Sequence, residues 1–109
     1  QGKHTLSPEV STVLFRIAQE ALTNVVRHAK AKQATVRICL EASFATLSIC
    51  DDGQGFNPQR ELAHRNHRAA WGLIGMQERA TLIGGTFSVN SAVGKGAEVT
   101  VVVPIQERK

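Results

Sequence analysis

The sequence is poor in cysteine and aromatic residues and has no long apolar run, and each shortage excludes a class of protein. No apolar stretch approaches the roughly 20 residues that a membrane-spanning helix needs, so we expect no membrane contact. Residues 1–4 are polar and lead into no apolar segment, unlike a secretory signal. Aromatic residues make up 5% and the basic residues are scattered, so the formal charge of +4 does not indicate nucleic-acid binding.

The two cysteines, Cys39 and Cys50, have neither CxxC nor zinc-ligand spacing. They fall in two consecutive expected strands, so we expect them to lie near each other as reduced thiols of a cytoplasmic domain. A chain of 109 residues allows one domain, 1–109, and no second packed core. Because the first residue is Gln1 rather than Met, we interpret the chain as a piece of a longer protein.

Apolar periodicity predicts a helix, two strands, a second helix and two further strands. Ser7 and Pro8 are typical of an N-cap and a first helical residue. Residues three and four apart form the apolar face of the first helix: Leu14, Ala18, Ala21, Leu22, Val25 and Ala29. The expected ranges are 8–30 and 71–83 for the helices and 34–41, 46–50, 86–90 and 97–104 for the strands. The pattern predicts an α/β fold, a two-layer sandwich whose mostly antiparallel sheet is covered on one face by helices.

The first helix carries a polar stripe beside its apolar face. Glu20 and Asn24 are four residues apart, Arg27 follows seven after Glu20, and His28 lies beside them. A carboxylate, an amide oxygen and cationic groups together can hold a hydrated Mg²⁺ and the phosphates that it bridges. The alternative is a solvated helix face with an attraction between Glu20 and Arg27.

The second expected strand ends in Asp51, followed by Gly53 and Gly55. Strand alternation turns Asp51 toward the side that the helices cover, where a carboxylate needs a partner such as an adenine amino group. The two glycines let the backbone pass close to a flat ring. The alternative is a strand that runs into a common Asp-Gly turn.

Two further glycine-containing segments complete the pattern. Gly72, Leu73, Gly75 and Met76 open the second expected helix, where free backbone N–H groups form an anion site. The alternative is a helix that simply begins after a flexible loop. Gly94 and Gly96 by themselves indicate only a hairpin turn.

Taken in order, these four segments resemble the N, G1, G2 and G3 boxes of the ATP-binding catalytic domain of sensor histidine kinases. That superfamily also includes DNA gyrase, a heat-shock chaperone and a mismatch-repair ATPase. The phrases RIAQEALTNVVRHA (16–29) and GMQERA (75–80) resemble the subfamily that signals to response regulators with helix-turn-helix output. The resemblance covers residues 7–104 and implies a Bergerat-type ATP-binding fold.

The resemblance also implies a role for each site residue. Asn24 would coordinate Mg²⁺, and Glu20 would orient a metal-bound water or support catalysis. Asp51 would accept a hydrogen bond from the adenine amino group. The nucleotide-binding set would be Asn24, Arg27, His28, Asp51, Gly53, Gly55, Gly72, Leu73, Gly75, Met76, Gly94 and Gly96. Residues 57–70, which the sequence predicts to be irregular in structure, would form a mobile lid over the nucleotide.

The implied activity is that of a protein histidine kinase, with ATP and Mg²⁺ as cofactors. The implied partners are a separate dimerisation domain with the phosphoacceptor histidine, and a response regulator. None of the four histidines here lies on such a helix, so the isolated chain should not autophosphorylate.

Ala70 and Ala97 replace a glycine and a threonine usual in the family, which could weaken ATP binding. The alternatives are an anti-sigma-factor-like serine kinase and a degenerate nucleotide-binding interaction module.

Overall fold

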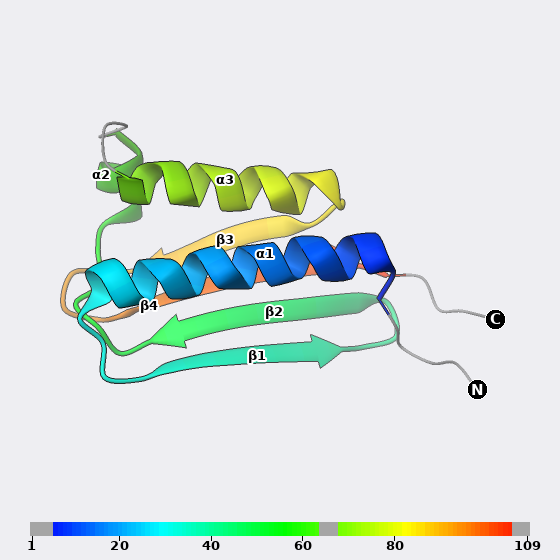
Figure 1. Cartoon of the computed structure of the whole chain (residues 1–109), viewed down its shortest axis with the longest axis horizontal. Helices are drawn as coiled ribbons and strands as arrows, with labels where there is room; N and C mark the ends of the chain where they lie inside the picture. Colours follow the sequence, from blue (N-terminus) through cyan, green and yellow to red (C-terminus); the bar gives the residue numbers. More distant parts are fainter. Residues whose placement is uncertain (1–5, 64–67, 106–109) are drawn as a thin grey trace.

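The chain folds into two layers, a sheet and a pair of helices packed on one of its faces (Figure 1). The computed structural model describes residues 6–63 and 68–105. Its elements are α1 (Pro8–Asn24), η1 (Val25–Ala29), β1 (Ala34–Leu40), β2 (Phe44–Asp51), α2 (Pro58–Ala63), α3 (Arg68–Leu82), β3 (Thr86–Ser91) and β4 (Ala97–Pro104). The strands lie in the order β1-β2-β4-β3, and every neighbouring pair is antiparallel. The predicted two-layer α/β sandwich is confirmed.

The first helix begins and ends close to its predicted limits. The Ser7 hydroxyl accepts a hydrogen bond from the Val10 N–H at 3.2 Å, which caps the first turn. After Asn24 the helix continues as η1, a π-helical turn, and it ends at Lys30 in the left-handed conformation, with φ 52°. The Ala29 carbonyl accepts a hydrogen bond from the Gln54 N–H at 2.7 Å. This bond ties the end of the helix to the loop that follows β2.

The core lies between the helices and the sheet. It consists of Leu14, Ile17 and Ala21 from α1, Leu73, Met76 and Ala80 from α3, and Leu47, Ile49, Val99, Val101 and Val103 from β2 and β4. Ile17 is absent from the predicted apolar face, yet it is fully buried. Ile17 lies three residues after Leu14 and four before Ala21, so it shares their stripe. The stripe is wide because α1 contacts both β2 and α3.

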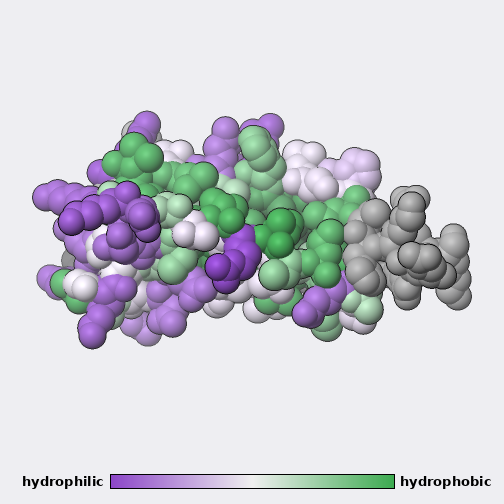
Figure 2. Space-filling view, turned by 90° about the horizontal axis from the view of Figure 1, so that it is seen from below, coloured by the Kyte–Doolittle hydropathy of each residue, from purple (hydrophilic) through white to green (hydrophobic). Residues whose placement is uncertain are grey.

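The edge strand β1 carries apolar side chains that the helices do not cover. Val36, Ile38 and Leu40 pair with the buried Ile49, Leu47 and Ala45, so they lie on the helix side of the sheet. They nevertheless remain exposed by 47%, 50% and 39%. Figure 2, which views the molecule from the β1 side, shows apolar surface through its middle. The alternation therefore predicted the strand correctly, whereas the burial it implied for β1 is wrong.

The second long helix begins earlier than predicted. It starts at Arg68 rather than at Trp71, and α2 precedes it inside the segment predicted to be an irregular lid. Asn57 supports the start of α2, because its Oδ1 accepts a hydrogen bond from the Arg60 N–H at 3.0 Å. Irregular structure was thus a wrong prediction for residues 58–63 and 68–70. Residues 64–67, with two of the histidines, lie outside the described range.

The cysteines lie on adjacent strands but not near each other. Cys39 pairs with Thr46, whereas Cys50 pairs with Thr35, four positions further along the hairpin. Both thiols are free and exposed. The antiparallel register, which the spacing alone does not fix, explains why the expected proximity is wrong. Within the described ranges, no helix is both long and apolar enough to cross a membrane.

Candidate functional site

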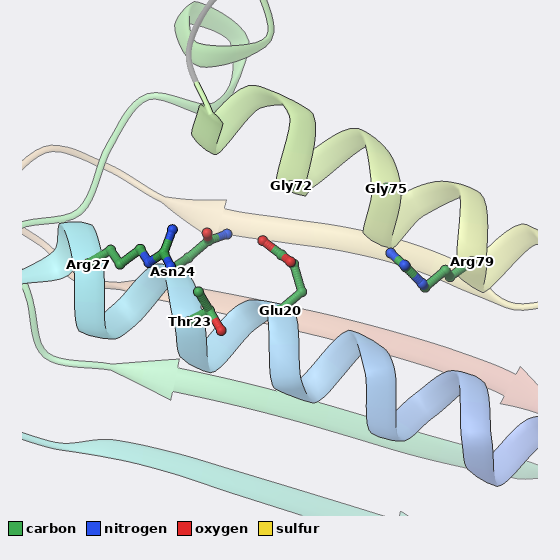
Figure 3. Close-up of a pocket in the computed structure, with 7 residues that line it drawn as sticks. All are labelled: Glu20, Thr23, Asn24, Arg27, Gly72, Gly75 and Arg79. Carbon is green, nitrogen blue, oxygen red and sulfur yellow. The ribbon is translucent and has the colours of Figure 1, made fainter.

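A cleft between α1 and α3 collects the predicted polar stripe (Figure 3). Its lining residues are Glu20, Thr23, Asn24, Arg27, Gly72, Gly75 and Arg79. The Thr23 hydroxyl donates to the Gln19 carbonyl at 2.9 Å, which leaves Glu20, Asn24 and the arginines as the chemically versatile groups. The structure therefore brings together residues from two segments that are some fifty positions apart in the sequence.

Gly72 is the point where the two helices leave room for these side chains. A Cβ atom at position 72 would lie 2.8 Å from Glu20 Oε2, 3.2 Å from Asn24 Nδ2 and 3.6 Å from Asn24 Oδ1. The carboxylate and the amide of α1 thus turn toward Gly72, a position on α3 that has no side chain, as Figure 3 shows for Glu20. Any larger residue at position 72 would compete with them for this space.

The donor set fits a hard cation that keeps part of its water shell. Glu20 and Asn24 supply carboxylate and amide oxygens, the ligands that Mg²⁺ prefers. Across residues 6–63 and 68–105 there is no cluster of three or more His, Cys, Asp and Glu side chains to form a protein-only cage. A magnesium ion here would therefore also need water and phosphate oxygens as ligands.

The predicted anion site at the start of α3 is wrong in its position. Because α3 begins at Arg68, the N–H groups from Gly72 onward lie beyond the first turn, whose amides alone are free. The side chains of Leu73 and Met76 are 4% and 0% exposed and belong to the core. Of the four residues predicted in this segment, only Gly72 and Gly75 line the cleft.

Asp51 lies at the end of β2, beside the end of η1. It continues the buried alternation of Leu47 and Ile49, so its predicted direction toward the helix layer is confirmed. Its Oδ1 accepts a hydrogen bond from the Gly53 N–H at 2.7 Å. Gly53 packs on the helix end, since a Cβ there would overlap the Ala29 carbonyl oxygen. Asp51 does not line the cleft; it lies near its Arg27 end through these contacts.

The loop after Asp51 depends on glycines because other backbone segments press against it. Gly55 has φ +67°, and a Cβ there would overlap the Ala92 carbonyl oxygen. Gly96 has φ +74°, and a Cβ there would overlap the Asp51 carbonyl oxygen. Gly94 donates its N–H to the Gln54 carbonyl at 2.5 Å. Gly94 and Gly96 therefore support the Asp51 loop and do not line the cleft.

Ser91 and Arg79 belong to this region, although the sequence analysis did not select them. The Ser91 hydroxyl accepts from the Phe56 N–H at 2.9 Å and donates to the Gly96 carbonyl at 2.7 Å, so it joins the two loops. Arg79 lies four residues after Gly75 and seven after Gly72, on the same stripe of α3. This spacing is the feature of the sequence that could have identified Arg79 as a cleft residue. His28 belongs to η1, but its side chain lies outside the described part.

Asp52, the neighbour of Asp51, has a structural role. Its Oδ1 accepts hydrogen bonds from the N–H groups of Lys32 and Gln33, at 2.8 and 3.0 Å. These bonds stabilise the ionised form and lower the pKa of the Asp52 carboxyl below its ordinary 3.8. The stability they contribute is present above about pH 4 and is lost as the pH falls through the lower, folded-state pKa.

Comparison with known proteins shows the protein family to which this chain belongs. Residues 9–107 match the family model described as "Histidine kinase-, DNA gyrase B-, and HSP90-like ATPase", and the chain belongs to this family. Membership implies that the domain binds ATP. The resemblance inferred from the four glycine- and asparagine-containing segments is thereby confirmed.

The relatives are sensor kinases. The chain is 35% identical over 100 residues to the signal transduction histidine-protein kinase/phosphatase DegS, and 43% identical over 100 residues to the sensor histidine kinase LiaS, both of Bacillus subtilis. Each alignment covers 92% of this chain and 26% of the relative, so the chain spans about a quarter of their length.

Two solved structures share the fold. The histidine kinase domain of a blue-light activated kinase from Erythrobacter litoralis aligns with a TM-score of 0.69 at 18% identity, over 88% of this chain and 45% of that one. The mycobacterial sensor histidine kinase MprB aligns with a TM-score of 0.67 at 23% identity, over 90% and 74%. At these identities the likeness concerns the fold.

Proposed function

We propose that the domain binds Mg-ATP in the α1–α3 cleft and donates its γ-phosphate to a histidine on a separate dimerisation domain of the same protein. The observation that carries this proposal is the convergence of Glu20 and Asn24 on Gly72. A carboxylate and an amide, which can both supply oxygen ligands to a metal, thus meet at a position that has no side chain. A response regulator would receive the phosphoryl group in turn.

From Asp51, beside the end of η1, to Glu20 on α1, the proposed site residues follow the order of base, phosphates and reacting phosphate in a nucleoside triphosphate. Asp51, at the η1 end, has one carboxylate oxygen engaged by Gly53 and a second oxygen left to accept from the adenine amino group. Gly53 and Gly55 let this loop pack closely against Ala29 and Ala92, which would hold it beside the base. Arg27, which lines the cleft, comes next along the helix and would face the phosphates, and His28 is proposed as a further phosphate contact. Asn24 and Glu20 follow, where the reacting phosphate would lie.

Magnesium, when bound, would supply charge neutralisation at the phosphates, which is the main demand of phosphoryl transfer. Asn24 would hold the ion directly through its amide oxygen. Glu20 would accept a hydrogen bond from a metal-bound water and orient it. In this arrangement the chain's own contribution is to position the triphosphate and to present its end to the acceptor.

The wider setting is also part of the proposal. The relatives named above are sensor histidine kinases, which favours this activity over that of an anti-sigma-factor-like serine kinase. We place the domain in the cytosol, where ATP and response regulators are found. Ala70 and Ala97 leave Asn24 and Asp51 in place, so the metal and adenine determinants persist despite these two departures.

The function is tested by phosphoryl transfer together with the variant Asn24→Ala. With γ-labelled ATP, Mg²⁺ and the histidine-bearing domain, the label should appear on that domain as acid-labile phosphohistidine, and none on this chain. Asn24→Ala should leave magnesium-free nucleotide binding nearly intact, remove the enhancement by Mg²⁺, and abolish transfer. Equal enhancement of nucleotide binding by Mg²⁺ in variant and wild type would contradict the metal site. Stoichiometric label on this chain would contradict the proposal that the acceptor histidine lies on a separate domain.

Gly72→Ala should change the stability of α3 and the ATP affinity of the cleft in opposite directions. Alanine should stabilise α3 by up to about 1 kcal/mol, because glycine is the poorer helix former. The added methyl group would come within 2.8 Å of the Glu20 carboxylate and displace it, so ATP affinity should fall about tenfold. Thermal unfolding and calorimetric titration measure the two effects. Glu78→Ala is the control, because Glu78 is exposed on the same helix. An ATP affinity of Gly72→Ala equal to that of the wild type would contradict the claim that ATP binding needs the space at position 72.

A further inference from the structure

The cleft contains more positive charge than its own carboxylate can balance. Arg27 lies toward one end and Arg79 toward the other, with Glu20 between them (Figure 3). Among the side chains that the structure describes, neither arginine forms an ion pair with a carboxylate. The family resemblance gives a role to Arg27 but none to Arg79. The second guanidinium therefore needs an explanation.

The backbone of α3 determines where the Arg79 guanidinium lies. A Cβ at position 75 would be 3.3 Å from Arg79 Nη1, so the side chain folds back over Gly75. Figure 3 shows it running from its own helical turn toward Gly75, alongside the cleft. The absence of side chains at Gly72 and Gly75 thus serves both helices: the first glycine makes room for Glu20, and the second makes room for Arg79.

The position of Arg79 along the cleft points to the far end of the nucleotide. Asp51 marks the adenine end, next to Ala29, whereas Arg79 faces the part of the cleft beside Glu20. From Ala29 to Glu20 the helix rises about 13 Å, at roughly 1.5 Å per residue. A nucleoside alone would not bridge this length, but a nucleoside triphosphate would. The group that reaches Arg79 is therefore the terminal phosphate.

We propose that Arg79 is a further nucleotide-binding residue, which contacts the γ-phosphate from α3 while Glu20 and Asn24 act from α1. A guanidinium presents its donors in a planar fork that matches phosphate oxygens. Since ADP has no γ-phosphate, Arg79 would make the site prefer ATP over ADP. This inference rests on the proposed function, because it assumes that the cleft holds the triphosphate.

The test compares two nucleotides on the same chain. Arg79→Gln should weaken binding of the non-hydrolysable β,γ-imido analogue of ATP about tenfold and change ADP binding less than about twofold. Arg79→Lys keeps the positive charge but loses the planar guanidinium donors. Its affinity for the ATP analogue should therefore lie between those of Arg79→Gln and the wild type. Arg37→Gln is the matched control, because Arg37 lies on β1 opposite Ser48, on the sheet face away from the helices. It should leave both affinities unchanged.

The outcomes distinguish this inference from the function on which it rests. If Arg79→Gln weakens both nucleotides equally, or neither, the γ-phosphate contact is wrong. Asp51→Asn, measured in parallel, should weaken both nucleotides, because both carry adenine. If Asp51→Asn has no effect, the proposed nucleotide site itself is wrong. Melting curves of the Arg79 variants, whose side chain is exposed, should match that of the wild type.

Discussion

Asp51→Asn is expected to lower ATP affinity about ten- to a hundredfold without unfolding the domain. An asparagine can still accept the Gly53 N–H through its amide oxygen, which preserves the loop. Its NH₂ group would then face the adenine amino group, so two donors would meet where the wild type has a charged acceptor. A hydrogen bond to a charged group is worth about 1.5–3 kcal/mol, which corresponds to the expected loss.

Calorimetric titration with ATP measures the effect, and Asp52→Asn is the control. Asp52 is the next residue in the chain and undergoes the same chemical change, but its carboxylate accepts from Lys32 and Gln33 instead. The control should bind ATP as the wild type does, at a pH near neutrality. Unchanged affinity in Asp51→Asn would show that this carboxylate does not recognise the base.

Ile17→Ala is expected to destabilise the fold by about 2–5 kcal/mol. Ile17 is completely buried in the core between α1, α3 and the sheet, so the truncation leaves a cavity as well as removing apolar burial. For a domain of this size, such a loss is a large part of the total stability. The midpoint of urea unfolding should therefore shift strongly to lower concentration, with the slope nearly unchanged.

Ile38→Ala is the matched comparison, because it is the same substitution on the same side of the sheet. Half of the Ile38 side chain is already in water, so its truncation should cost about 1 kcal/mol or less. An equal loss in the two variants would mean that the β1 edge is covered in solution. The pair of variants thus measures how far the core extends toward the edge of the sheet.

The sequence determined the two long helices, the four strands and the family of this protein. Regular apolar spacing identified both long helices and all four strands, because these periods reflect local backbone geometry. The stripe of Glu20, Asn24 and Arg27 needed only the helical repeat, and all three residues line one cleft. The direction of Asp51 followed from strand alternation. The family followed from the order of the four boxes, which the comparison confirms.

Only the tertiary structure decided which residues share a surface. Ile17 and Ile38 fit their local patterns equally well, but burial depends on which strands the helices cover, and β1 lies at the edge. Cys39 and Cys50 are separated by the register of the hairpin. Arg79 faces Glu20 because α3 packs on α1, a long-range contact that no local period encodes. Local sequence fixes the direction of a side chain along its own element, whereas the partner that it meets depends on packing.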